Sequence, residues 1–456
     1  MTTPIYPRAA SGEADMQVSH PQLVDGTELI GQLEGSGLRN PPYLVRRCDG
    51  QIVALSLLLF VIAAQLDGCD LETAAERVGR DLNVRIAPDK IAHVISRKLA
   101  PLGLVGPYGR VPPGLQPRDV LLGLRSRAAL VPARIVRRIA RALRPLYTRQ
   151  VVIIALVLLA ALDAWLIVHG IGGGLHEIIR TPTLMLGLVA LTLASLIWHE
   201  LGHATACRFG GARPGRIGIG IYLIWPAFYT DVTDSYRLGK VGRLRTDLGG
   251  IYFNGLFSLG AMGVFLATGY APLLVLIASQ QIIMLDQFTP WMRLDGYHVV
   301  SDLIGVTDLF ERIRPVVASL RPHSPAHPCA TELKPWARRA VNVWVVTTVC
   351  ALTALLVIVV IKAPGYATGG WSSIVVQARH LGAAAGNGNV AVGIISVIGI
   401  VLLSLPAVGV LYAYLSLCRG AGSRLALRRD DLTLTGLMTS RGVATPPAPP
   451  DSSGGG

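Results

Sequence analysis

Long apolar runs are the feature that most constrains the fold of this chain. Six runs follow residue 150, and each is close to or above the roughly 20 residues that cross a bilayer core of about 30 Å as a helix. They cover residues 151–169, 182–207, 247–269, 271–292, 341–361 and 390–417. Charged residues make up only 15% of the chain, against about a quarter in soluble domains. We therefore predict a mostly α, polytopic membrane protein with about six transmembrane helices.

The basic residues are distributed as expected for a membrane protein. The formal charge is +14, but the Lys and Arg residues flank the apolar runs instead of forming one dense stripe. If the chain before residue 151 is cytoplasmic, six spans leave only Arg180, Lys362 and Arg379 on the opposite side. This distribution follows the positive-inside rule. It predicts a multi-pass protein of the cell membrane, in contact with the lipid bilayer, with both termini in the cytoplasm.

The chain divides into five segments by composition. Its polar ends, the second rich in Pro, Gly and Ser, are too hydrophilic to build a core. We predict a disordered N-terminus, a small soluble domain, a basic juxtamembrane linker helix, a transmembrane domain and a cytoplasmic tail that is disordered from about residue 445. Their ranges are 1–21, 22–115, 116–150, 151–418 and 419–456, in that order. The arginines of the linker fit a helix lying on lipid headgroups and, equally, a solvated linker helix.

The small N-terminal domain carries local signals for strands and for helices. Asp49 and Gly50 are typical of a hairpin turn between two strands. Asp70 is a candidate N-cap, and apolar residues recur at helical spacing from Ile91 to Leu99. Short strands with three helices predict a winged-helix fold. The helix that would enter a DNA groove, PDKIAHVISRKLA, has only three Lys and Arg residues, so we do not expect nucleic acid as a partner.

A HExxH motif lies in the second apolar run. HELGH at 199–203 places His199 and His203 on one helix face, one turn apart. Two imidazoles at this spacing can hold one zinc ion, and Glu200 can serve as general base toward the attacking water. Ionisable residues inside an apolar span are costly unless they are paired or bind a metal. The motif therefore predicts one Zn²⁺ per chain and Glu200 as the catalytic residue.

A third zinc ligand is expected from a later span. A catalytic zinc takes three protein ligands and keeps one position open. Asp295 follows the fourth span, at the end that lies on the same membrane side as HELGH in the six-span topology. Asp286 is the rival ligand, but it would lie about 13 Å deeper along a continuous helix. The topology favours Asp295 and an active site that opens to the cytoplasm.

With these two motifs the sequence resembles the site-2 protease family of intramembrane zinc metalloproteases. That family pairs HExxH on one transmembrane helix with an LDG motif on a later one, and Leu294-Asp295-Gly296 matches the second motif. Within the family the chain is similar to the bacterial peptide zinc metalloproteases, through the segments FYTDVTDSYRL and MRLDGYHVVSDLIGV. The resemblance covers about residues 182–305. The zinc ligands that it implies are His199, His203 and Asp295, with Glu200 as the catalytic residue.

Two further features concern the substrate. The family often has an Asn-x-x-Pro segment before the LDG motif, and here Gln287 precedes Pro290 at that spacing. Because Gln can donate and accept hydrogen bonds as Asn does, the resemblance implies Gln287 and Thr289 as substrate-positioning candidates. The segment 217–234 alternates like a strand, and related proteases place a sheet there that could pair with an extended substrate. A cytoplasmic loop with an interfacial aromatic belt fits the segment equally well.

The N-terminal domain adds a second resemblance. Residues 22–115 resemble the winged-helix peptide-binding domains of the coenzyme-PQQ synthesis protein D family, on Asp49-Gly50, Leu66-Asp67-Gly68 and the helix end LAPLGLV. Such domains hold leader peptides of ribosomally made natural products. Together the resemblances imply an intramembrane zinc endopeptidase that processes a membrane-associated or ribosomally made precursor peptide, whose leader peptide residues 22–115 would bind. The alternatives are a non-hydrolytic peptide exporter or immunity protein, and regulated intramembrane proteolysis of a membrane-bound regulator.

Overall fold

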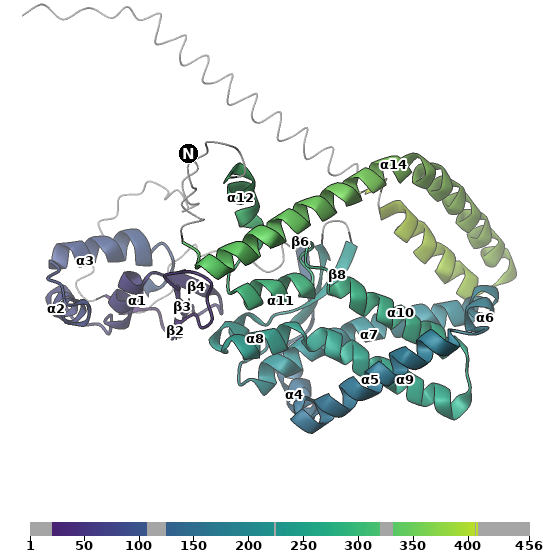
Figure 1. The fold of residues 1–456 in the computed structure, drawn as a ribbon, viewed down its shortest axis with the longest axis horizontal. Coiled ribbons are helices and arrows are strands. Elements are labelled where there is room, and N and C mark those ends of the chain that lie inside the picture. The colour runs from purple at the N-terminus through teal and green to yellow at the C-terminus, as the bar shows by residue number, and fades with distance from the viewer. Residues whose placement is uncertain (1–20, 107–124, 223–224, 320–331, 406, 409–456) are drawn as a thin grey trace, which may run out of the picture.

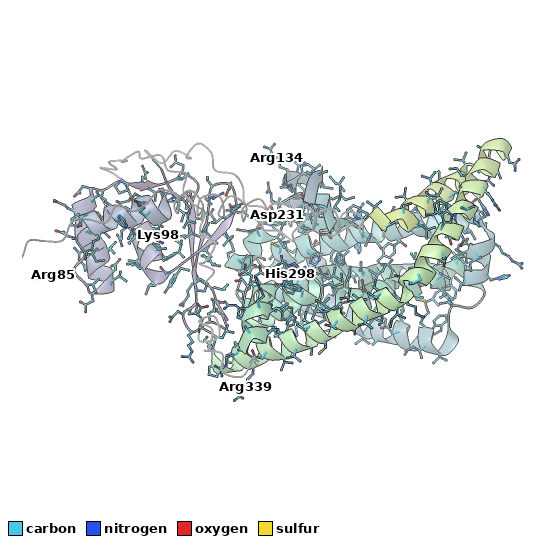
Figure 2. All side chains as sticks on the ribbon, turned by 90° about the horizontal axis from the view of Figure 1, so that it is seen from above. Arg85, Lys98, Arg134, Asp231, His298 and Arg339 are labelled. Atoms are coloured by element: carbon cyan, nitrogen blue, oxygen red, sulfur yellow. The ribbon has the colours of Figure 1, made fainter. Side chains whose placement is uncertain are left out.

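The computed structural model describes residues 21–106, 125–222, 225–319, 332–405 and 407–408 (Figure 1). The disorder predicted for residues 1–21 and from about residue 445 falls outside the described residues except at Pro21, as do the rest of the predicted tail and the end of the sixth predicted span. A small domain of short strands and helices lies to one side of a set of long helices (Figure 1). Figure 2 shows the same division from above, with Arg85 and Lys98 on the small domain.

In the part of the chain that the structure describes, four helices are long and apolar enough to cross a membrane, judged by length and composition. They are α5 (Arg149–His169), α7 (Pro182–Phe209), α9 (Gly249–Thr268) and the first 31 residues of α14 (Pro335–Asn387). Their outer surfaces are apolar; Ile154 and Val157 on α5, for example, are 58% and 63% exposed. Contiguous exposed apolar surface of this kind suits lipid and not water. These helices match the first, second, third and fifth predicted spans.

Of the other two predicted spans, the fourth is shorter in the structure and the sixth is described only in part. Helix α10 (Pro272–Gln287) has only 16 residues, and of the last run the apolar helix Val390–Leu405 is described. Helix α10 ends before the predicted span does because Pro290 follows: proline has no N–H to donate, and its ring clashes with the carbonyl four residues earlier. The chain is helical again from the start of α11 (Asp295–Ile304).

Close contact between α7 and α9 fixes the HELGH end of α7. A Cβ atom on Gly202 would lie 2.2 Å from the carbonyl oxygen of Gly249, so glycine is required for the two backbones to approach this closely. The buried hydroxyl of Tyr147 lies 3.1 Å from the Gly202 carbonyl oxygen and 3.3 Å from that of Gly249. Tyr147 also packs with Phe253 and Ala206 in one buried apolar cluster. The ends of α7 and α9 are therefore held together by both backbone and side-chain contacts.

A three-stranded antiparallel sheet lies beside these helices, in the order β6–β7–β8. Its strands are β6 (Arg125–Val131), β7 (Ile217–Tyr222) and β8 (Trp225–Thr230). The strand-like pattern at 217–230 thus corresponds to a hairpin, with Ile217 opposite Thr230. Strand β6 differs from the predicted linker helix at 116–150. The helix α4 (Ala133–Ala142) begins only after Pro132, whose fixed φ suits a helix start, and the preceding residues pair with β7 instead.

The N-terminal domain contains the predicted hairpin and helices. The two hairpin strands, β3 (Tyr43–Arg46) and β4 (Ile52–Leu55), pair in an antiparallel register across the Asp49–Gly50 turn, where Gly50 has a φ of +90° that favours glycine. The Asp70 side chain accepts a hydrogen bond from Thr73 N and caps α2. The remaining elements are β1 (Gln22–Leu23), β2 (Glu28–Gln32), α1 (Leu57–Ala64), α2 (Leu71–Leu82), α3 (Pro88–Val94), a π-helical turn (Ile95–Leu99) and β5 (Val105–Gly106). The winged-helix assignment itself stays a prediction.

The segment from residue 33 to 39 joins this domain to the helices that follow the sheet. Arg243, which is 1% exposed, donates to the Glu34 carbonyl oxygen at 3.0 Å and to the Asp302 carboxylate at 3.2 Å. Gly37 N donates to the Gly305 carbonyl oxygen at 2.9 Å. The helices of this region are α8 (Lys240–Asp247), α11, α12 (Ile313–Ser319) and two 3₁₀ turns (Thr233–Arg237 and Leu309–Arg312). A short helix, α6 (Gly174–Arg180), connects α5 to α7.

Candidate metal centre

The side chains of His199, His203 and Asp295 converge on one point between α7 and the start of α11. The Nε2 atoms of the two histidines are 3.0 Å apart. Oδ2 of Asp295 lies 3.2 Å from Nε2 of His199 and 3.4 Å from Nε2 of His203. Within the described ranges, these three residues form the single group of His, Cys, Asp or Glu side chains close enough to hold a metal ion. The structure therefore brings together the three residues proposed from the sequence as ligands.

The spacing and chemistry of these atoms fit zinc. Zn²⁺ binds imidazole nitrogen and carboxylate oxygen at about 2.0–2.2 Å, so the ligand atoms of a tetrahedral site are about 3.3–3.6 Å apart. The separations of 3.0, 3.2 and 3.4 Å are close to this range. Two imidazoles and one carboxylate are also a known catalytic donor set, which keeps a fourth position for water or substrate.

Helix α7 presents both histidines, and α8 orients one of them. The i, i+4 spacing places the two rings on the same helix face, where their centroids are 4.7 Å apart. Nδ1 of His203 lies 2.8 Å from the carbonyl oxygen of Thr246. Since a carbonyl only accepts, Nδ1 carries the proton, and Nε2 is left with a lone pair that faces the cluster. Metal-binding histidines are commonly held in this way.

The LDG segment places Asp295 as the first residue of α11. Leu294 is extended, and the helix begins directly after it. A Cβ atom on Gly296 would lie 2.2 Å from the Phe288 carbonyl oxygen, so only glycine allows the chain to fold back onto the end of α10 here. Burial on its own would raise the pKa of Asp295, but positive charge at His203 and His199 lowers it well below its usual range; a bound metal ion would supply that charge when the two imidazoles are neutral ligands. Asp295 is therefore an ionised carboxylate, the form that binds metal.

Gly250 provides the space for the two imidazoles on the α9 side. A Cβ atom at this position would lie 2.2 Å from Cε1 and 2.3 Å from Nε2 of His199, and 2.5 Å from Nε2 of His203. Any larger residue would occupy the volume of the rings. The sequence reasoning did not single out Gly250. The signal that could have identified it is the Gly249-Gly250 pair at the start of an otherwise apolar span.

Glu200 is held by the sheet. Its side chain is buried, and the hydroxyl of Thr230, the last residue of β8, lies 2.7 Å from Oε2 and 2.9 Å from the main-chain oxygen of Glu200. Thr230 is itself buried, with 6% of its surface exposed. The sequence analysis placed a strand here but assigned no role to Thr230. No linear motif joins the two residues, which are separated by 30 positions.

The two substrate-positioning candidates lie outside the three-residue cluster. Oε1 of Gln287 accepts a hydrogen bond of 3.1 Å from Nδ2 of Asn254, a buried residue of α9. The hydroxyl of Thr289 donates to the carbonyl oxygen of Asp286. Asp286, the rival ligand, is exposed and is not a member of the cluster. Gln287 and Thr289 remain predictions, since neither has a contact here that reveals a substrate.

Three other polar residues near the centre have structural partners. Asp231 accepts from Thr233 N at 3.2 Å, and Asp234 accepts from Arg213 N at 2.7 Å. His298, one turn into α11, packs edge-on against Tyr297; burial lowers the pKa of His298 below its usual value. Figure 2 shows Asp231 and His298 in the middle of the molecule, next to the small domain. None of the three is a member of the three-residue cluster.

Comparison with known proteins gives one distant relative. No family model matches the chain, and no solved structure matches it significantly. The chain is 22% identical over 138 residues to a Bacillus subtilis (strain 168) protein named "Putative peptide zinc metalloprotease protein YydH". The match covers 30% of this chain and 54% of the relative, about half of that protein's length. Taken with four membrane-type helices and the His-His-Asp cluster, this similarity supports a zinc metalloprotease with apolar helices and nothing finer.

Proposed function

We propose that the chain is a membrane-embedded zinc endopeptidase of the site-2 protease type. The observation that carries the proposal is the convergence of three donor atoms, 3.0–3.4 Å apart, beside the carboxylate of a HExxH glutamate. His199, His203 and Asp295 would hold one Zn²⁺, and Glu200 would be the catalytic residue. The same buried polar residues have no evident structural purpose in an apolar span, where each costs free energy unless paired or bound to metal.

The chemistry follows from the position of Glu200. Bound zinc would polarise the scissile carbonyl and lower the pKa of the attacking water. Glu200 would take a proton from that water and deliver it to the leaving nitrogen, so that the bond to nitrogen breaks without a free amide anion. Its burial excludes bulk water from competing for the carboxylate. The hydrogen bond from Thr230 restricts where the carboxylate can point.

Strand β8 is the proposed binding site for the scissile segment. It is an outer strand of the described sheet, since its pairing partner is β7. An extended peptide that adds to this edge would form main-chain hydrogen bonds with β8. The end of β8 contacts Glu200, so a peptide paired there would lead to the metal centre. A helical substrate would have to unwind before it could bind in this way.

The proposed substrate is a membrane-associated or ribosomally made precursor peptide. We propose further that residues 22–115 bind its leader peptide, that six helices span the membrane and that both termini and the active-site opening are cytoplasmic. Support comes from the distribution of Lys and Arg and from the contacts that tie the small domain to α8 and to the 3₁₀ turn before it. An ion pair between Glu28 and Arg237 and the hydrogen bonds of Arg243 make this connection.

The test compares the wild-type chain with Glu200→Gln, purified in detergent and incubated with a library of quenched fluorescent decapeptides. Gln keeps the size of the side chain and removes its basicity. We expect unchanged zinc content and a loss of cleavage of at least about 100-fold. Glu177→Gln is the matched control, because Glu177 is exposed on α6 and its substitution should change neither quantity. Equal cleavage by Glu200→Gln, or zinc binding by a wild-type chain that cleaves no peptide, would contradict the proposal.

A further inference from the structure

We propose that Thr230 positions Glu200 for catalysis, so that the strand offered to the substrate and the general base form one unit. This inference rests on the proposed function and deepens it. It assigns to Thr230 a positioning role that acts through Glu200. The base can then be correctly placed only when the end of β8 is in its native register.

The hydroxyl of Thr230 is placed to donate to the Glu200 carboxylate. A threonine hydroxyl has one proton to donate, and the nearer acceptor is the carboxylate, at 2.7 Å against 2.9 Å for the main-chain oxygen of Glu200. Among the described residues, Thr230 is the side chain that donates a hydrogen bond to this carboxylate. A glutamate has several rotatable bonds, and without a donor its carboxylate would sample other orientations. The hydrogen bond from Thr230 therefore selects one orientation of the Glu200 carboxylate.

The end of β8 is itself fixed. Thr230 pairs with Ile217, which is 1% exposed. Directly after it, Asp231 N donates to the Arg216 carbonyl oxygen at 3.0 Å, and Gly215 N donates to the Asp231 carbonyl oxygen at 2.7 Å. The backbone around Thr230 is thus fixed by its pairing with β7 and by the two hydrogen bonds that follow it. A shift of one residue in this register would turn the hydroxyl to the other face of the sheet.

Loss of the Thr230 hydroxyl should affect kcat and not KM. An interaction that orients the base matters when the proton moves, and it contributes little to the binding of substrate in the ground state. The ligand atoms of His199, His203 and Asp295 have no hydrogen bond from Thr230, so zinc binding should be independent of it. The expected signature of the positioning role is a lower kcat with unchanged KM and unchanged zinc content.

The experiment uses Thr230→Val, Thr230→Ser and Thr205→Val in the full chain, with one quenched decapeptide selected from the library. Valine keeps the shape of threonine and removes the hydroxyl, whereas serine keeps the hydroxyl. Thr205 is the matched control: it is a buried threonine on α7 whose hydroxyl donates to the Leu201 carbonyl oxygen at 2.6 Å and not to Glu200. Melting temperature and zinc content are recorded for each variant. If Thr230→Val does not fold, Thr230→Ala is used in its place, because it removes the same hydroxyl.

We expect Thr230→Val to lower kcat about 10- to 100-fold with KM within about twofold. Thr230→Ser should stay within about threefold of the wild type, and Thr205→Val within about twofold. The proposal is overturned if Thr230→Val cleaves as fast as the wild type, or if Thr230→Ser is as impaired as Thr230→Val. In either case a loss of cleavage in Glu200→Gln would leave the proposed function standing. Cleavage by Glu200→Gln at the wild-type rate would instead contradict the proposed function.

Discussion

The N-terminal domain and the metal centre are built in opposite ways. In the domain the buried residues are mostly apolar, and a single core includes Val45, Ile62, Val78 and Leu99. Around the metal centre the buried residues include polar and ionisable ones, while the same helices expose apolar side chains outward. On α7 the buried residues of the centre are His199, Glu200 and His203; the other buried polar residues of α7 and α9 are Ser195, Thr205, Asn254 and Ser258.

The difference shows what each region is organised for. The domain gains stability by removing apolar surface from water. The membrane-type helices cannot gain in that way against lipid, so close packing at glycines and internal hydrogen bonds hold them together. Burying His199, Glu200, His203 and Asp295 costs stability, and the chemistry proposed for these four residues explains their presence. Substitutions should therefore separate the two regions: changes at the metal centre should abolish function, and changes in the domain core should reduce stability.

The largest expected effect comes from His203→Ala. The change removes one proposed ligand, so we expect zinc content to fall from about one per chain to near zero and cleavage to fall more than about 1,000-fold. Hydrogen exchange in α1 to α3 should be unchanged, because the domain core does not include the cluster. His176→Ala is the control, as His176 is exposed on α6. Full zinc content in His203→Ala would show that the metal lies elsewhere.

The next effect is on stability alone. Leu99 is fully buried in the domain core, so Leu99→Ala should lower the free energy of unfolding of the domain by about 2–5 kcal/mol. The free energy of unfolding is measured by urea titration, with hydrogen exchange in α2 and α3 as the probe. Leu57→Ala is the control, because Leu57 is 49% exposed, and should cost far less. Loss of zinc from Leu99→Ala in the absence of denaturant would contradict the separation of the two regions.

A smaller effect on the metal centre should come from Gly250→Ala. The added methyl group would lie within 2.5 Å of both imidazoles, so the rings must move and zinc affinity should drop about 10- to 100-fold. Competition with a chelator gives the affinity. Gly263→Ala is the control. Gly263 lies on the same helix with open space at its Cβ position, so this variant should bind zinc as the wild type does. Equal affinity in the two variants would show that α9 does not confine the imidazoles.

The smallest effect concerns a surface ion pair of the domain. The hydrogen bond from Arg77 lowers the pKa of Asp67 to about 2, from 3.8. A lowered folded-state pKa contributes stability above the unfolded-state value, and this is lost as the pH falls through about 2. Because the pair is exposed, Asp67→Asn should lower the melting temperature of the domain by less than about 2 °C at pH 6. The difference between variant and wild type should vanish near pH 2; a difference that grows on acidification would contradict this assignment.

The parts of the fold predicted from sequence are those set by local patterns. Long apolar runs identified four membrane-type helices, Asp70 identified the start of α2, and i, i+4 spacing identified a histidine pair on one face of α7. Asp295 could be proposed because topology places the ends of two spans on one side. Each of these inferences needs only neighbouring residues or the thickness of a bilayer.

The parts that sequence did not predict depend on contacts between distant segments. Strand β6 forms because β7 is available to pair with it. The arginines that follow β6 led to the prediction of a linker helix over the whole stretch. Gly250 and Thr230 act on His199 and Glu200 across helix and sheet contacts that no linear motif records. The early end of α10 was missed because apolar composition outweighed the effect of Pro290 in that stretch.

The central claim is that His199, His203 and Asp295 hold one zinc ion. X-ray absorption at the zinc edge, on the purified full chain and on Asp295→Ala, tests it most directly. We predict about one zinc per chain with nitrogen and oxygen ligands at about 2.0–2.2 Å, two of them imidazoles, and a loss of most of that zinc in Asp295→Ala. Sulfur ligands at about 2.3 Å, or an unchanged spectrum in Asp295→Ala, would contradict it.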